Sequence, residues 1–468
     1  MSITLKRYPE YRDSGTDWIG RIPAHWNCLP NRAIFQERID KNHPDEPLLS
    51  VTIGQGVVPQ REFLKDSSKR DSSNQDKRNY KLVLPNDIAY NKMRAWQGAL
   101  GASQIRGIVS PAYVVVSFRK ERDNPTYFHY LMRTPTYAKE AERWSYGISS
   151  DQWSLRSEDF KRIYVPAPPG DEQNHIGHFL KWMHHQIHQL IRSKRREIEL
   201  LNAQKQAVID SELAAQNVRN GWECTRLKYV AAVHTGVTLG KRYRDTPLFA
   251  YPYLRVANVQ NGFLDLGTIK TVEVPEAEAR ACTLQPGDVL MTEGGDIDKL
   301  GRGSVWRGEI PNCLHQNHVF AVRTAQERLN SDFLVLLMTS RYGRTYFQST
   351  AKKTTNLAST NQTTIRNFPL LLPPIDQQAE LVRSVSLRSS DLEMAIRRAA
   401  REIELIREHR TRLIIDVVMG KLDVRGNKVP QIDLEQAAEN SGSDETGEVE
   451  MLEEEETVPA EEGDDAAD

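Results

Sequence analysis

The chain has 468 residues, of which 39% are hydrophobic and 27% are charged, a composition typical of a globular protein with more than one domain. It has neither a long apolar run nor an apolar signal-peptide core near its start, so we expect a cytoplasmic protein without a membrane span. The four cysteines lack CxxC spacing, which argues against a zinc site or a disulfide framework.

The net charge of −1 hides an uneven distribution. Residues 433–468 contain 16 acidic and no basic residues, so residues 1–432 carry a net charge of +15. A basic body attracts polyanions, and nucleic acid is the commonest of these. The acidic tail is poor in apolar residues, which predicts disorder, and it could act as a solubilising segment or compete with nucleic acid for the basic surface.

In chain order, each half begins with short β-type runs and continues with helices. The turn signals LPND and QPGD precede short strands, and the runs AYVVVSF (Ala112–Phe118) and HVFAVR (His318–Arg323) predict further strands. One short helix is expected in each half, over residues 127–141 and 332–347. A proline-bounded strand follows in each (IYVPAPP and FPLLLPP), and Asp171 and Asp376 then stand where they could cap a long helix.

The two halves are copies of one module. The pentapeptide REIEL occurs at residues 196–200 and again at residues 401–405, a separation of 205 residues. The same offset aligns Tyr137 with Tyr342 and PPGDEQ with PPIDQQ, whereas upstream of these positions it shrinks. A tandem repeat therefore organises the chain.

Both long helices carry an apolar stripe with alternating spacings of four and three residues, which is typical of a coiled-coil seam. Matching stripes in one chain predict that the helices pack antiparallel, although two unrelated surface helices would be an alternative. The predicted core positions are Ile187, Ile191, Ile198, Leu201 and Val208 in the first helix and Leu392, Ile396, Ile403, Ile406 and Leu413 in the second.

The order and duplication of these motifs resemble the specificity subunit of type I restriction–modification systems. The resemblance covers residues 22–425 and is strongest at LPPIDQQ, at IREHRTRLIIDVVMGKLDV, and at MTEGGDIDKLGRG with CLHQNHVF. It implies two target recognition domains that each read half of a split double-stranded DNA site, and a helical spacer that sets the gap and docks methyltransferase subunits, two of them by analogy. Restriction and translocation subunits are further possible partners.

The resemblance gives an α+β fold, in which a mixed α/β target recognition domain and a long helix occur twice and the two helices form an antiparallel coiled coil. The expected divisions are residues 1–165 and 216–370 for the recognition domains, 166–215 and 371–425 for the spacer helices, and 426–468 for the acidic tail. The chain itself is expected not to be catalytic and to bind no cofactor. It lacks a P-loop and the FxGxG and (N/D/S)PP(Y/F) loops of a methyltransferase, so S-adenosylmethionine would bind to the partner.

Polar, basic and glycine-rich segments supply candidate DNA contacts in each module, because such side chains contact phosphates and base edges. A solvated loop without a ligand is the alternative for each segment, and a plain turn is the alternative for the glycine-rich loop. In the first module the candidates are Lys65, Lys69, Arg70, Lys77, Arg78, Asn91, Lys92, Arg94, Trp96, Gln97 and Tyr146. In the second they are Tyr253, Arg255, Asn258, Gly294, Gly295, Lys299, Arg302, His315, Gln316, Asn317, Lys352, Lys353 and Asn356.

The first module lacks the GGDxDKLGR pattern of the second, so unlike readers predict an asymmetric target. His315 and His318 have no evident third ligand nearby, and the His184–His188 pair is not repeated in the second copy, so no metal site is expected.

A function from another class also fits the helices. A coiled-coil scaffold could organise partner proteins without reading DNA, but it would not need polar glycine loops in its variable domains.

Overall fold

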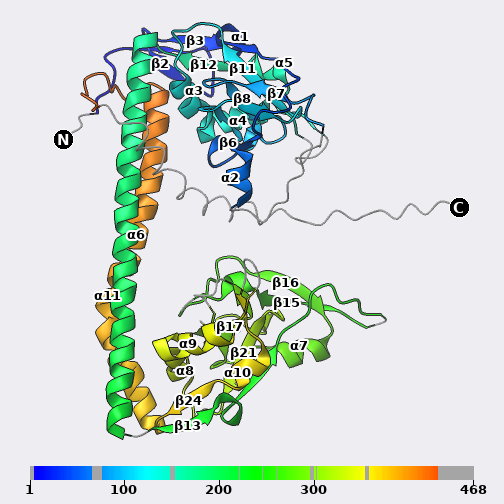
Figure 1. The fold of residues 1–468 in the computed structure, drawn as a ribbon, viewed down its shortest axis with the longest axis vertical. Coiled ribbons are helices and arrows are strands. Elements are labelled where there is room, and N and C mark those ends of the chain that lie inside the picture. Colours follow the sequence, from blue (N-terminus) through cyan, green and yellow to red (C-terminus); the bar gives the residue numbers. More distant parts are fainter. Residues whose placement is uncertain are drawn as a thin grey trace, which may run out of the picture. The chain divides into compact units, whose positions relative to one another are not determined.

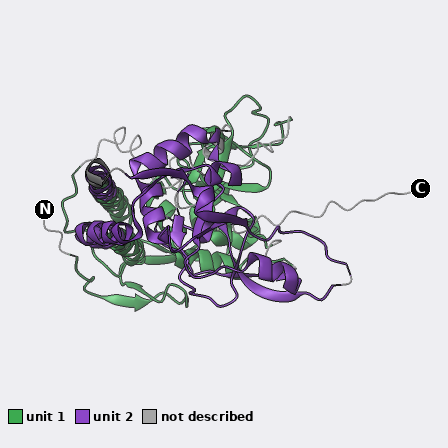
Figure 2. Cartoon of the chain, turned by 90° about the horizontal axis from the view of Figure 1, so that it is seen from below, with its two compact units in different colours: residues 1–194, 401–468 green, residues 195–400 purple. Residues whose placement is uncertain are grey.

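The computed structural model describes residues 5–65, 76–147, 153–220, 222–244, 246–260, 262–295, 300–301, 303–353 and 358–430. The chain divides into two compact units, which Figure 2 colours separately. Unit 1 comprises residues 1–194 and 401–468, and unit 2 comprises residues 195–400.

A four-stranded antiparallel sheet lies at the centre of unit 1, with the order β4-β11-β8-β9. Its strands are β4 (Phe35–Glu37), β8 (Ile88–Asn91), β9 (Leu100–Ala102) and β11 (Tyr113–Phe118). The middle strand β11 is the predicted valine-rich run. Its three valines are buried, as β-branched side chains commonly are in a sheet with both faces covered.

The remaining strands of unit 1 form pairs, and its helices are short except for its parts of the long helices α6 (Gly170–Asn220) and α11 (Ile375–Val418). The strand pairs are β1 (Tyr11–Asp13) with β2 (Arg21–Pro23), β3 (Asn27–Pro30) with β12 (Tyr164–Ala167), β5 (Leu49–Thr52) with β6 (Gly56–Pro59), and β7 (Lys81–Val83) with β10 (Gly107–Val109). The short helices are α1 (Asn31–Ile34), α2 (Gln60–Lys65), η1 (Ala95–Gln97), α3 (Pro125–Met132), α4 (Pro135–Arg143) and α5 (Ser157–Phe160).

Unit 2 contains a sheet with the same topology. The order β14-β21-β17-β19 repeats that of unit 1, element for element. The strands are β14 (Ala231–Thr235), β17 (Val289–Thr292), β19 (Gly303–Val305) and β21 (Val319–Thr324). The predicted mixed α/β module, present twice, is therefore confirmed.

The other strands of unit 2 form one two-stranded and two three-stranded sheets. The other strands are β13 (Glu223–Arg226) paired with β24 (Pro369–Leu372), the set β15 (Phe249–Leu254), β16 (Lys270–Val274) and β20 (Leu314–His315), and the set β18 (Gly294–Gly295), β22 (Lys352–Lys353) and β23 (Ala358–Ser359). The short helices are η3 (Leu227–Tyr229), η4 (Val256–Asn258), α7 (Glu276–Cys282), α8 (Ser331–Thr339), α9 (Arg341–Thr350) and α10 (Gln362–Arg366).

The turns LPND and QPGD start β8 and β17 as predicted. Asn86 and Gly287 adopt positive φ angles of 74° and 97°, a conformation open to asparagine and glycine. The next residue, Asp87 or Asp288, is buried and accepts a 2.8 Å hydrogen bond from a backbone amide three residues upstream. The aspartate thus closes the turn before the strand begins.

The single short helix expected in each half is two helices, because a hydroxyl residue interrupts it. Thr134 accepts a hydrogen bond from the amide of Tyr137, and Ser340 accepts one from Gly343, so α4 and α9 each start with a side-chain cap. The sequence-based prediction was wrong about this break.

A buried glutamine ties the start of each long helix to the rest of its unit. Gln378 is fully buried; its Nε2 donates to the carbonyls of Arg328 and Pro373, and its Oε1 accepts from the amide of Asn330, all at 2.8 Å. Asn330 in turn caps α8. The second glutamine of the LPPIDQQ motif, Gln378, therefore links the long helix, the segment after the preceding strand and the start of α8.

Gln173 makes the corresponding contacts in unit 1. Its Oε1 accepts from the amide of Asn124 at 2.8 Å, and its Nε2 donates to the carbonyl of Pro168 at 2.9 Å. Asp171 and Asp376 do not cap the long helices as expected, because α6 begins at Gly170 and α11 at Ile375. Both carboxylates lie instead in the first turn, where the helix dipole favours negative charge.

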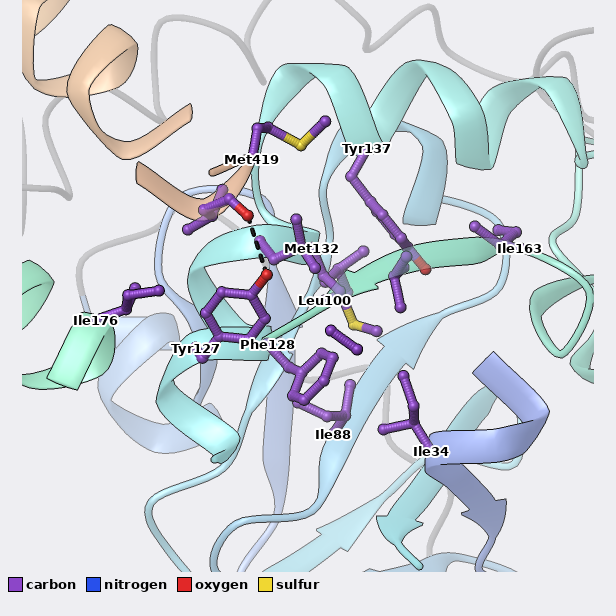
Figure 3. Packing of buried hydrophobic residues seen from close by; sticks show 14 of the residues in the cluster. Ile34, Ile88, Leu100, Tyr127, Phe128, Met132, Tyr137, Ile163, Ile176 and Met419 are labelled. Atoms are coloured by element: carbon purple, nitrogen blue, oxygen red, sulfur yellow. Dashed lines mark hydrogen bonds between the residues drawn. The ribbon is translucent and has the colours of Figure 1, made fainter. Parts of the chain in front are cut away.

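The core of unit 1 joins residues from both ends of the chain (Figure 3). Tyr127 is fully buried, and its hydroxyl proton is shared between the carbonyls of Pro166 and Val418, each 3.0 Å from the hydroxyl oxygen. The side chain of Met419 is buried in the same cluster. Residues after position 400 thus complete the interior of a unit that begins near the N-terminus.

Polar contacts around Glu172 close the same unit. The Glu172 carboxylate accepts hydrogen bonds from the Tyr8 hydroxyl at 2.7 Å and the Trp26 indole at 3.1 Å. Arg425 lies over the Tyr8 ring, 4.9 Å from its centroid. The amide of Asp423 donates to the carbonyl of Lys6 at 2.7 Å, so the first and last described segments of the chain pair with each other.

The two long helices are α6 (Gly170–Asn220) and α11 (Ile375–Val418), and each contributes one part to each unit. Within unit 1 the helices lie side by side (Figure 1), with an ion pair of 2.9 Å between Lys194 and Glu402 and a 3.5 Å contact between His188 and Arg410. The residue number rises on one helix as it falls on the other, so the helices are antiparallel, as predicted.

Within unit 2 the pairing follows the same direction. Lys205 forms a 2.7 Å ion pair with Glu393, and Glu212 pairs with Arg388. No predicted core position of either helix is exposed. The positions are Ile187, Ile191, Ile198, Leu201, Val208, Leu392, Ile396, Ile403, Ile406 and Leu413. Among the described residues, no helix has the length and apolar character needed to cross a bilayer.

Candidate nucleic-acid interface

The loop after β8 in unit 1 packs against a hairpin that is distant in sequence. The carbonyl of Lys92 accepts a 2.9 Å hydrogen bond from the amide of Leu155. Tyr146 and Ser154 form a β-bridge, and the rings of Trp96 and Trp153 meet edge to face at 5.5 Å. The structure thus brings the predicted segment YNKMRAWQG together with the described ends of SYGISSDQW, at one end of the sheet; residues 148–152 lie outside the described residues.

Several polar groups of this loop hold its own shape. Asn91 accepts from the amide of Met93 at 3.0 Å, the Trp96 indole donates to the carbonyl of Met93 at 2.9 Å, and Arg94 donates to Gln97 at 3.0 Å. These bonds order the loop around η1. Lys92 forms no ion pair with any described residue, and its side chain is half-buried.

Unit 2 contains the same loop-and-hairpin arrangement. The carbonyl of Glu293 accepts from the amide of Thr360 at 2.8 Å. Gly294 and Gly295 then pair with β23, which also pairs with β22. We call the platform of unit 1 the loop after β8 together with the paired segments 146–147 and 153–155, and the platform of unit 2 residues 293–295 together with the paired segments 352–353 and 358–360.

The HQNH run divides between the interior and this platform. His315 is 1% exposed, and its Nδ1 lies 2.6 Å from the carbonyl oxygen of Val319. Burial lowers the pKa of His315, so its ring stays neutral. His318 is exposed, and its Nδ1 lies 2.6 Å from Oε2 of Glu293. Gln316 and Asn317 are half-buried between them.

Three of the predicted contacts in unit 2 serve the interior instead. Asn258 is 4% exposed; it accepts from the amide of Arg255 and donates to the carbonyls of Asp265 and Thr268, so it fixes the turn after η4. Tyr253 is buried in the β15 sheet. With His315, these residues do not present their side chains to a ligand, because polar residue type alone does not reveal burial. Arg255 is half-buried.

The predicted basic segment of unit 1 is only partly described. Arg78 is exposed and forms a 2.9 Å ion pair with Asp76, and Arg78 holds the pKa of that carboxyl at about 2. Lys77 is half-buried, and Tyr146 and Lys352 are exposed. For the remaining predicted contacts, either the residue or its side chain is outside the part of the chain that the structure describes. They are Lys65, Lys69, Arg70, Lys299, Arg302, Lys353 and Asn356.

Further basic side chains gather beside Lys92. The ammonium of Lys81 donates to the carbonyl of Tyr113 at 2.7 Å, at the end of the sheet where β11 begins. Burial lowers the pKa of Lys81, the Glu37 carboxylate opposes that shift, and the ammonium groups of Lys92 and Lys41 reinforce it. Lys41, Lys81 and Glu293 were missed by sequence reasoning. Aligning LPND with QPGD gives Lys92 and Glu293 the same position in their modules, so this alignment could have identified Glu293.

The histidines of α6 lie in the helix pair rather than on a platform. The rings of His184 and His188 are 4.3 Å apart, and burial together with His188 and Arg410 lowers the pKa of His184 to about 3. The described part of the chain holds no group of three His, Cys, Asp or Glu side chains placed to bind a metal.

The fold defines a class of protein in which a mixed α/β module and a long helix occur twice and the two long helices pack antiparallel. A solved structure of this class, described as "Structural basis underlying complex assembly and conformational transition of the type I R-M system", is 13% identical and has a TM-score of 0.51. The match covers 85% of this chain and 98% of that chain. At this identity the likeness establishes the fold.

Sequence comparison identifies the relatives. The StySPI specificity subunit of a type I restriction enzyme from Salmonella potsdam is 23% identical over 273 residues, 56% of this chain and 58% of that protein. The EcoKI specificity subunit from Escherichia coli strain K12 is 29% identical over 140 residues, 29% of each protein. The chain matches less than two thirds of the length of these relatives, and no family model matches it. The predicted resemblance to type I specificity subunits is confirmed.

Proposed function

We propose that this chain is the DNA-recognition subunit of a type I restriction–modification complex and reads a bipartite, asymmetric target. One observation carries the proposal: both units have the same sheet and the same platform, but the platforms present different side chains. Lys92 and Trp96 belong to one platform, and Glu293, whose carboxylate contacts His318, belongs to the other. Two similar readers with unlike surfaces suit two unlike half-sites.

The net charge supports the proposal because it favours affinity for DNA. Residues 1–432 carry +15, and binding to a duplex depends strongly on such charge because each phosphate contact releases a counterion. The Lys81 ammonium lies at the end of the unit 1 sheet where β11 begins, and the charges of Lys41 and Lys92 act on it. The kinship with specificity subunits points the same way.

The proposal extends to partners and chemistry. Methyltransferase subunits, two of them because the module is repeated, would dock on the helix pair of α6 and α11, and restriction or translocation subunits can join the same complex. The chain would contribute no catalytic residue, in keeping with relatives described as specificity subunits. Transfer of the methyl group from S-adenosylmethionine would take place in the methyltransferase partner.

Adenine-methylation sequencing of the host genome, with and without the gene, tests the proposal. We expect one bipartite, asymmetric motif to lose its methylation on deletion and to regain it when the full chain is supplied. A methylome that does not change on deletion, in cells where the methyltransferase is expressed, contradicts the proposal and favours a scaffold without DNA readout.

A further inference from the structure

The two platforms carry opposite charges at one equivalent backbone position. Lys92 directly follows β8, and Glu293 directly follows β17. Each carbonyl accepts a hydrogen bond from one amide in the second paired segment of its platform, that of Leu155 at 2.9 Å or that of Thr360 at 2.8 Å. The backbone is thus fixed in the same way in both units, while the side chain changes from an ammonium to a carboxylate.

These two side chains have opposite hydrogen-bonding capacities. An ammonium group offers donors only, and an ionised carboxylate offers acceptors only. In the major groove, guanine presents the acceptors N7 and O6, whereas cytosine N4 and adenine N6 are amino donors. A donor at residue 92 and an acceptor at residue 293 therefore select different base edges.

The surroundings of Glu293 favour a base over the DNA backbone as its partner. A carboxylate on a DNA-binding surface is repelled by phosphates, so it does not add to general affinity. His318 lies 2.6 Å from Oε2 of Glu293, which orients the carboxylate and leaves Oε1 to accept from an external group. The Glu293 side chain is 35% exposed and that of His318 is 55% exposed, so both are accessible.

We infer that Lys92 and Glu293 are corresponding specificity determinants, with Lys92 selecting a guanine in one half-site and Glu293 selecting a base with an amino group in the other. This inference rests on the proposed function, since it assigns base contacts within the proposed DNA interface. The basic groups around Lys92 suit an acceptor-rich edge, and the His318–Glu293 pair suits a donor.

The experiment uses the full chain in its complex with the methyltransferase, supplied to cells that lack the gene. The variants are K92Q, the charge swap K92E and the near-isosteric E293Q, with K120Q and E273Q as controls. Lys120 is exposed just after β11, at the end of that strand opposite Tyr113, and Glu273 is exposed on β16. The readouts are the methylated motif and the binding of duplexes that carry each base at every half-site position.

We expect K92E and K92Q to lose preference for guanine at one position of one half-site by about tenfold or more, the size of a lost base contact. E293Q should relax one position of the other half-site, and the controls should leave the motif unchanged. Thermal unfolding like that of the wild type would show that each variant is folded, since the platform bonds are made by the backbone.

Two outcomes overturn the inference. If K92Q weakens binding to all sequences alike and lowers the salt dependence of binding, Lys92 contacts a phosphate and carries no specificity. If K92E and E293Q keep the wild-type motif at wild-type affinity, neither residue touches DNA. Failure of the proposed function is distinguishable, because then the wild-type chain itself restores no methylated motif.

Discussion

The buried Gln378 offers a direct test of how the long helix is attached to unit 2. Replacing it with alanine removes three hydrogen bonds of 2.8 Å and leaves an amide and two carbonyls without that partner. At about 1 kcal/mol net per bond, with a further cost for buried unpaired groups, we expect a loss of about 3 to 5 kcal/mol in the free energy of unfolding.

Hydrogen exchange followed by mass spectrometry, combined with chemical denaturation, measures this effect. Exchange should accelerate around α8 and the start of α11, because Asn330 would lose the contact that positions its cap. Glu380, exposed two residues further along the same helix, provides the control variant E380Q, which should behave like the wild type. A Q378A chain that unfolds within about 1 kcal/mol of the wild type would refute the reasoning, because three buried bonds would then contribute almost nothing.

Three further results are expected. Burial lowers the pKa of His129 and His184 to about 3, so the unfolded chain binds more protons below pH 6.5. Stability should therefore fall as pH drops from 6.5 toward 3, by about 2 kcal/mol per histidine at pH 5, and H129N should reduce this dependence in denaturant titrations; equal stability at pH 7.5 and pH 5 would contradict it. Y127F loses the buried hydroxyl proton that the carbonyls of Pro166 and Val418 share and should lower the free energy of unfolding by about 1 to 3 kcal/mol, with a wild-type unfolding curve as the contrary outcome. Inserting matched heptads into α6 and α11 should lengthen the gap in the methylated motif, whereas an unchanged gap would show that helix length does not set it.

Much of the fold could be predicted from local patterns. The repeated REIEL and the fixed offset revealed the duplication, the apolar stripes predicted the helix pair, and the turns before Asp87 and Asp288 located two strands. These signals are local in sequence or repeat at a fixed period, so they can be recognised without knowledge of tertiary contacts. The break at Thr134 was missed because a single hydroxyl cap is a weak signal beside a helical pattern.

The candidate site was less accessible to sequence reasoning because it depends on long-range contacts. The pairing of Lys92 with Leu155 and that of Glu293 with His318 join residues that no periodicity relates. Polar type also misled the assignment of Asn258 and His315, whose groups are satisfied inside unit 2. Hydrogen bonding to the backbone and contact with a ligand use the same side chains, and only burial separates the two roles.

The contact between Lys6 and Asp423 has a consequence for how the protein is made. Unit 2 is encoded by one continuous stretch, residues 195–400, whereas unit 1 needs residues from both sides of it. During synthesis, which proceeds from the N-terminus, the interior around Tyr127 stays incomplete until Val418 and Met419 have left the ribosome. A message cut short before codon 401 would therefore yield a chain in which the first-made unit is the one left unfinished.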